Sequence, residues 1–143
     1  MKFENWVKAT FVSPTLNDVA TRRSSPQELN KMHKALHMAD SMLGQETVAA
    51  IAFGRFSGFG DSLLVLTDER LLIVKNSFQS GLFISLRRNE LSEVRLSQVP
   101  LLGHALTLQG GSYRFSRISA GSAADIRTVL SVEQKQSLMT RAA

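Results

Sequence analysis

The side chains best placed to do chemistry lie on one predicted helix. His33 and His37 are four residues apart, and Asp40 is one further step along. At that spacing two imidazoles and a carboxylate share a helix face and can meet one metal ion. The pair lacks the glutamate of a zinc-protease motif, and no other ligand cluster occurs in the sequence. We therefore interpret the histidines as the flank of an amphipathic helix and predict no metal site.

Other catalytic patterns are also missing from the sequence. There is no Gly-x-Ser-x-Gly elbow and no phosphate-binding loop, and the third histidine, His104, stands alone after Gly103. Gly54, Gly58 and Gly60 are spaced as GxxxGxG, but they lie between two predicted strands, where no helix N-terminus is available for a phosphate. We predict that the protein is not an enzyme and uses no cofactor.

Composition predicts one ordinary domain with a real core. The chain has 143 residues, of which 43% are hydrophobic and 20% are charged. It has no cysteine, no apolar run of signal-peptide length at its start and no run long enough to span a membrane. These features predict a cytoplasmic protein without a transmembrane segment.

The formal net charge of +5 permits, without requiring, an electrostatic partner. Basic residues are scattered, and no run exceeds two. The later strands nevertheless carry a set of arginines that form a candidate basic patch for nucleic acid or an anionic membrane, namely Arg87, Arg88, Arg95, Arg114 and Arg117. This electrostatic function is the alternative hypothesis.

Residues 1–45 show helical periodicity and are predicted to form an N-terminal helical extension. Phe3, Trp6 and Phe11 fall on one face, which we expect to dock onto the domain or a sister subunit; insertion into a membrane interface is the alternative. Ser25 and Glu28 then form a capping box, and Gly44 suits a helix stop, so a helix is predicted over 26–43. Its apolar stripe is Leu29, Met32, Leu36, Ala39 and Leu43.

From Glu46 onward the pattern changes to short strands separated by turns. The stretch 63–75 reads LLVLTDERLLIVK, two apolar runs joined by a tight turn. Both runs are apolar at every position, which indicates strands buried on two faces. We predict that the helix over 26–43 covers the second face.

The later strands alternate more regularly. Gly110 and Gly111 form a two-residue hairpin turn that places Gln109 opposite Ser112, Leu108 opposite Tyr113 and Leu106 opposite Phe115. A C-terminal helix follows, with Ser122 predicted as its cap. The element order predicts an α+β fold: a seven-stranded antiparallel barrel or sandwich with a C-terminal capping helix and an added N-terminal helical segment. Predicted strands cover 46–56, 62–67, 70–75, 82–87, 90–99, 105–109 and 112–118.

This layout resembles the pleckstrin-homology (PH) superfold, and the hairpin resembles bacterial YokE-like PH domains more narrowly. The positions of their turn signature are occupied here by Thr67, Asp68, Arg70 and Leu71. Two further fragments resemble the residue pattern of the same domains: Leu91-x-x-Val94 and Leu101-Leu102-Gly103. The resemblance covers 46–131 and implies a PH-like domain over 46–143. Asp68 and Arg70 are predicted to serve the fold, with Arg70 bonded to turn carbonyls or to Asp68 or Glu69.

The resemblance implies an adaptor role, commonly with self-association. The basic cluster of lipid-binding PH domains is absent, because the loop from Arg55 to Asp61 holds one arginine and one aspartate. We therefore expect a non-catalytic module that binds a protein partner or forms a homo-oligomer. Phe59 and Phe78 lie in loops and are the candidate contact residues.

Overall fold

The computed structural model describes residues 13–57, 59–77 and 82–130. Three helices come first, α2 (Pro14–Arg23), α3 (Pro26–Lys31) and α4 (His33–Leu43), and a C-terminal helix is described over 120–130. The strands between them are β1 (Val48–Phe56), β2 (Asp61–Thr67), β3 (Arg70–Lys75), β4 (Leu82–Arg87), β5 (Arg95–Gln98), β6 (His104–Leu108) and β7 (Tyr113–Ile118). The predicted docking residues Phe3, Trp6 and Phe11, and the candidate contact residue Phe78, lie outside the described residues.

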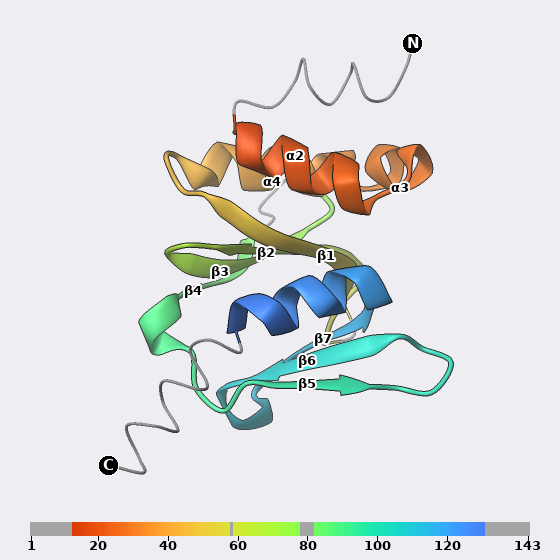
Figure 1. Cartoon of the computed structure of the whole chain (residues 1–143), viewed down its shortest axis with the longest axis vertical. Coiled ribbons are helices and arrows are strands. Elements are labelled where there is room, and N and C mark those ends of the chain that lie inside the picture. Colours follow the sequence, from red (N-terminus) through yellow and green to blue (C-terminus); the bar gives the residue numbers. More distant parts are fainter. Residues whose placement is uncertain (1–12, 58, 78–81, 131–143) are drawn as a thin grey trace.

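All seven strands belong to one antiparallel sheet in the order β4-β3-β2-β1-β7-β6-β5. The α2–α4 layer lies on one side of β1–β3, and the C-terminal helix, blue in Figure 1, lies between those strands and β5–β7. This architecture confirms the α+β, PH-like fold class. The sheet is not closed, however, so the predicted barrel is an open, bent sheet.

The hairpin β2–β3 is buried on both faces, as predicted. Leu63, Val65, Leu72 and Val74 pack in one apolar cluster with the N-terminal helices. The alternate residues face a second cluster, which includes the C-terminal helix and the β6–β7 hairpin: Leu64, Leu66, Leu71 and Ile73. The predicted stripe of the helical segment lies in the first cluster, so the helical cover is confirmed. Fully burying one such side chain contributes about 1.5–3 kcal/mol.

Helix ends confirm some predictions and correct others. Ser25 accepts a hydrogen bond from the Glu28 N–H at 3.2 Å, and Glu28 accepts one from the Ser25 N–H at 3.0 Å, as a capping box requires. The helix predicted over 26–43 is interrupted at Met32, which has φ −101° and ψ 15°. Ser122 is not a cap: the C-terminal helix begins at 120, and Ser119 accepts from the Ser122 N–H at 3.4 Å.

The β6–β7 register was predicted correctly. Leu106 pairs with Phe115 and Leu108 with Tyr113. The connection is longer than the predicted two-residue turn, because Gln109–Gly111 form a 3-10 turn in which Gln109, Gly110 and Gly111 have φ of 53°, 67° and 93°. Among the described residues, no helix is long and apolar enough to cross a membrane.

Three predicted strands are shorter than expected. The first begins at Val48 instead of Glu46, the seventh begins at Tyr113 instead of Ser112, and the fifth covers Arg95–Gln98 instead of 90–99. The preceding residues form a short 3-10 turn (Arg88–Glu90) and then a bend in which Glu93 has φ 46°. Gln109 fixes this bend, because its side-chain oxygen accepts from the Ser92 N–H at 2.7 Å.

Candidate functional site

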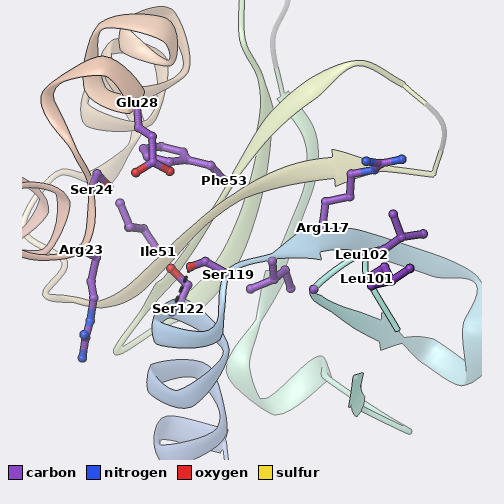
Figure 2. A pocket seen from close by; sticks show the side chains of 12 residues that line it. Arg23, Ser24, Glu28, Ile51, Phe53, Leu101, Leu102, Arg117, Ser119 and Ser122 are labelled. Carbon is purple, nitrogen blue, oxygen red and sulfur yellow. Dashed lines mark hydrogen bonds between the residues drawn. The ribbon is translucent and has the colours of Figure 1, made fainter. Parts of the chain in front are cut away.

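A concave surface lies inside the sheet, where the neighbouring strands β1 and β7 separate. Two cavities of about 300 and 280 Å³ adjoin there and share Glu28, Phe53 and Arg117 in their walls. We call them together the β1–β7 groove. In Figure 2, Glu28 and Phe53 lie on one side of the first cavity, and Arg117 and Leu102 lie on the other. The N-terminal helices, β1, β7 and the tip of the β5–β6 hairpin therefore meet at one site.

Local backbone features of β1 and β7 create the groove. Among the described residues, the two strands pair only at Arg55–Ser116 and Phe56–Phe115. Gly54 permits this contact, because a Cβ there would lie 2.2 Å from the Ser116 carbonyl oxygen. Before Gly54 the strands are not paired with each other, and the cavities occupy the region between them.

An irregularity in β7 directs Arg117 toward the groove. The β6–β7 register shifts between His104 and Leu106, so β7 has one extra residue opposite that step. Arg117 lies at this bulge with φ 63°. A non-glycine residue in the left-handed region costs roughly 1–2 kcal/mol, and bulges often re-aim a side chain beside a functional site. Arg117 lines both cavities of the groove.

The β5–β6 hairpin tip adds exposed apolar surface at the groove. Leu101 is fully exposed and Leu102 is 47% exposed. The tip is held by a hydrogen bond from the Val99 N–H to the Gly103 carbonyl at 2.8 Å, and Leu101 has φ 66°. Gly103 is required here because its φ is 76° and an added Cβ would lie 2.6 Å from the Ile118 carbonyl oxygen.

Two ion pairs stand at the ends of the groove. At one end, Arg23 donates to Asp125 of the C-terminal helix, with its Nη2 2.7 Å from Oδ1. This hydrogen bond, together with the charge of Asp125, raises the pKa of Arg23 above its ordinary value. At the other end, Lys31 Nζ lies 3.4 Å from an Asp61 oxygen. The acids of these pairs hold two of the groove's basic side chains.

Arg55 and Arg117 differ from those two basic residues. Both side chains are exposed and line the second cavity, and neither has a hydrogen bond or ion pair with any other residue of the described ranges. They come from neighbouring strands, because Arg55 pairs with Ser116, the residue before Arg117. The second cavity therefore has two arginine side chains in its wall that no acid of the described residues engages.

The structure does not gather the predicted basic patch. Arg95 and Arg114 lie on one face of β5–β7, since both pair with Thr107 on the strand between them. Arg87 and Arg88 line a separate hollow that also contains Glu46 and Glu69. Arg117 belongs to the groove. The five arginines thus occupy three places.

Phe59 lies in an aromatic cluster elsewhere on the sheet. Its ring centroid is 5.1 Å from that of Phe83 and 6.3 Å from that of Phe56, and 54% of the residue is exposed. Leu82, which is 45% exposed, precedes Phe83 in strand β4. Phe59 therefore both packs against the domain and presents a surface to solvent.

The histidines of α4 form no metal cluster. Their ring centroids are 6.3 Å apart, and His33 Nδ1 lies 2.7 Å from the Asn30 carbonyl oxygen. Asp40 accepts from the Ser13 N–H at 2.9 Å. Burial lowers the pKa of His37, and the neighbouring His33 lowers it further. No group of three His, Cys, Asp or Glu residues within the described ranges is placed to hold a metal ion.

The turn residues Asp68 and Arg70 make hydrogen bonds within the protein, but the acidic partner predicted for Arg70 was wrong. Asp68 accepts from the Thr47 N–H at 3.0 Å. Arg70 pairs with Glu46, with an Nη2–Oε2 distance of 2.8 Å, instead of with Asp68 or Glu69. It also donates to the Met42 carbonyl at the end of α4. The turn thus joins the sheet to the helical layer.

Sequence reasoning missed the groove, although it named two of its components. Gly54 was noted as part of the GxxxGxG spacing, without the close strand contact that it permits. The fragment Leu101-Leu102-Gly103 was noted for its family likeness, without any role at a site. Arg55 and Lys31 carried no signal, because nothing local to them predicts which side chains face β7.

Comparison with known proteins adds no relative. No protein-family model matches the chain, and no curated protein matches it in sequence.

Proposed function

We propose that the protein is a non-catalytic, PH-like interaction module that binds a protein partner, or a second copy of itself, through the β1–β7 groove. The observation that carries this proposal is the combination of apolar and charged side chains in the wall of one groove. Phe53, Leu101 and Leu102 supply apolar surface, and Glu28 and Arg117 stand beside them. Protein interfaces combine these two components.

Two further features support a macromolecular partner. Leu101 is held fully exposed on a hairpin tip, in a backbone conformation that a leucine rarely adopts. Large apolar side chains grouped at the rim of a cavity indicate a contact surface more often than scattered single ones do. The likeness to bacterial YokE-like PH domains agrees with an adaptor role, and we place that role in the cytoplasm.

The electrostatic alternative receives less support from the geometry. A protein that binds nucleic acid or an anionic membrane by charge gathers its basic side chains on one face. Here the predicted arginines are divided among the groove, the outer face of β5–β7 and the hollow beside Glu46. Arg95 and Arg114 share one face of β5–β7, with Thr107 of β6 between them.

Photo-crosslinking tests the proposal in the host cell. Benzoylphenylalanine at Leu102 is expected to capture a protein, either a partner or a second copy, whereas the same group at Ser97, exposed on β5, is expected to capture none. Nuclease treatment before analysis removes nucleic-acid carry-over, and light scattering after size exclusion reports self-association. Equal capture from both positions, or none from Leu102, contradicts the proposed surface.

A further inference from the structure

The groove of the proposed function also indicates the chemistry of its occupant. Its floor is the part of β1 that precedes Gly54, and one edge of that segment is not paired. β2 pairs with the opposite edge through this region, including Ile51–Val65 and Phe53–Leu63. On the β7 side, pairing among the described residues stops at Arg55.

The backbone groups of Ile51 and Phe53 point toward this open edge. The Ser57 N–H donates to the Arg114 carbonyl of β7 at 2.8 Å, so Ser57 directs its backbone groups toward β7. In an antiparallel strand this direction alternates from residue to residue. Steps of two from Ser57 lead to Arg55, which pairs with β7, and then to Phe53 and Ile51. These two residues line the groove, so their N–H and C=O groups are positioned to pair with an added strand.

The charges of the groove select the added strand. Four basic side chains line its two cavities, Arg23, Lys31, Arg55 and Arg117, against two acidic ones, Glu28 and Asp61. Asp125 and Asp61 engage Arg23 and Lys31. Glu28 accepts from the Ser25 N–H. Arg55 and Arg117, at neighbouring positions on β1 and β7, are not engaged by these acids and are suited to bind carboxylates. A planar guanidinium binds a carboxylate in a bidentate way.

We infer that the β1–β7 groove binds an extended acidic peptide segment of a partner protein, which adds a short strand to β1. Backbone hydrogen bonds to Ile51 and Phe53 hold the segment. A carboxylate side chain lies on Arg117 and Arg55, and an adjacent large apolar side chain packs against Phe53 and Leu102 in the first cavity. This inference rests on the proposed function and specifies its ligand.

An eight-residue peptide library, selected against the whole chain, tests the assignment. The expected winners carry Asp or Glu within two positions of Leu, Ile or Phe. For a selected peptide, replacing the acid by its amide, or methylating the backbone nitrogens that pair with β1, is expected to weaken binding about tenfold, measured by fluorescence anisotropy. Winners without acids, or an unchanged affinity after methylation, overturn the inference.

Charge reversal in the protein gives the complementary test. Arg117→Glu is expected to weaken the acidic peptide about tenfold or more and to shift the library toward Lys and Arg. Arg95→Glu makes the same charge change on the outer face of β5 and is expected to leave both results unchanged. Arg117→Gln removes the charge alone, so it serves if the reversal unfolds the protein by circular dichroism. Equal losses in the Arg117 and Arg95 variants refute the assignment.

The outcomes separate this inference from the proposed function. If the library yields no acidic binder while the crosslinker at Leu102 captures a protein, the groove is an interface but the acidic strand is wrong. If neither experiment detects binding, both fail.

Discussion

Replacing Arg70 by methionine is expected to lower the free energy of unfolding by about 2–4 kcal/mol. The guanidinium holds Glu46 through Nε at 2.9 Å and Nη2 at 2.8 Å, reaches Ser85 at 3.3 Å and donates to the Met42 carbonyl. The Glu46 side chain is only 8% exposed. Methionine keeps the apolar stem of arginine but removes the charged partner of the Glu46 carboxylate, which keeps its hydrogen bond from the Thr67 hydroxyl at 2.8 Å, and it removes the Arg70 donor of the Met42 carbonyl.

The magnitude follows from the exposure of the pair. Breaking a fully buried ion pair by removing one partner costs about 3–5 kcal/mol. The Arg70 side chain is 26% exposed, so water replaces part of the lost interaction, and the expected loss of unfolding free energy falls to about 2–4 kcal/mol. For a domain of this size the loss corresponds to a fall in Tm of roughly 7–13 °C.

Urea unfolding followed by far-ultraviolet circular dichroism measures the effect. Arg95→Met is the matched control, because Arg95 is exposed on β5, and it is expected to change stability by less than about 0.5 kcal/mol. Glu46→Gln and the double variant complete a cycle whose coupling energy isolates the pair. A loss below about 1 kcal/mol for Arg70→Met, or one equal to the control, would show that the turn does not fasten the helical layer.

Two other substitutions test the backbone and the pH response. Gly54→Ala is expected to cost about 3 kcal/mol or more, since its Cβ would lie 2.2 Å from the β7 backbone, whereas Gly60→Ala meets nothing within 4 Å and is expected to be tolerated; urea midpoints compare them. Burial and His33 depress the pKa of His37 in the folded state, although Asp40 opposes them, so the unfolded chain binds the proton more tightly. The contribution of His37 to the free energy of unfolding should therefore be constant above about pH 7.5 and fall as the pH drops through about 6.5. His37→Gln should remove this component of the fall, and an unchanged pH profile would contradict it.

The fold was accessible from the sequence where the pattern is local. Alternation and the Gly110-Gly111 turn predicted the pairing of Leu106 with Phe115, because a slip by one residue exposes a whole apolar face. The run Leu63–Leu66, apolar on both faces, predicted a second cover. Local pattern did not identify the partner of Arg70, since Glu46 lies 24 positions away and nearer acids compete for the same guanidinium.

The candidate site was not accessible for a related reason. A groove depends on where two strands separate, and β1 and β7 are far apart in the chain. The glycine at position 54 does not reveal which strand approaches it, and periodicity assigns Arg117 to one face of β7 without revealing the bulge at which it lies. A binding surface built from irregularities of long-range pairing leaves little trace in residue alternation.

The same two irregularities lie where β1 and β7 separate and connect that separation to the proposed function. At Gly54 the strands touch so closely that no side chain fits, and beyond that point, beside the bulge that contains Arg117, they are not paired with each other. A sheet whose β1–β7 pairing continued past Arg55 would cover the backbone of Phe53 and Ile51 and leave no room for a ligand. Instead, Arg117 has a strained backbone conformation, and the β7 side of β1 before Arg55 is not paired with another strand of the described residues; both features lower the stability of the protein. Those costs are explained together if a partner's strand completes the sheet at this position.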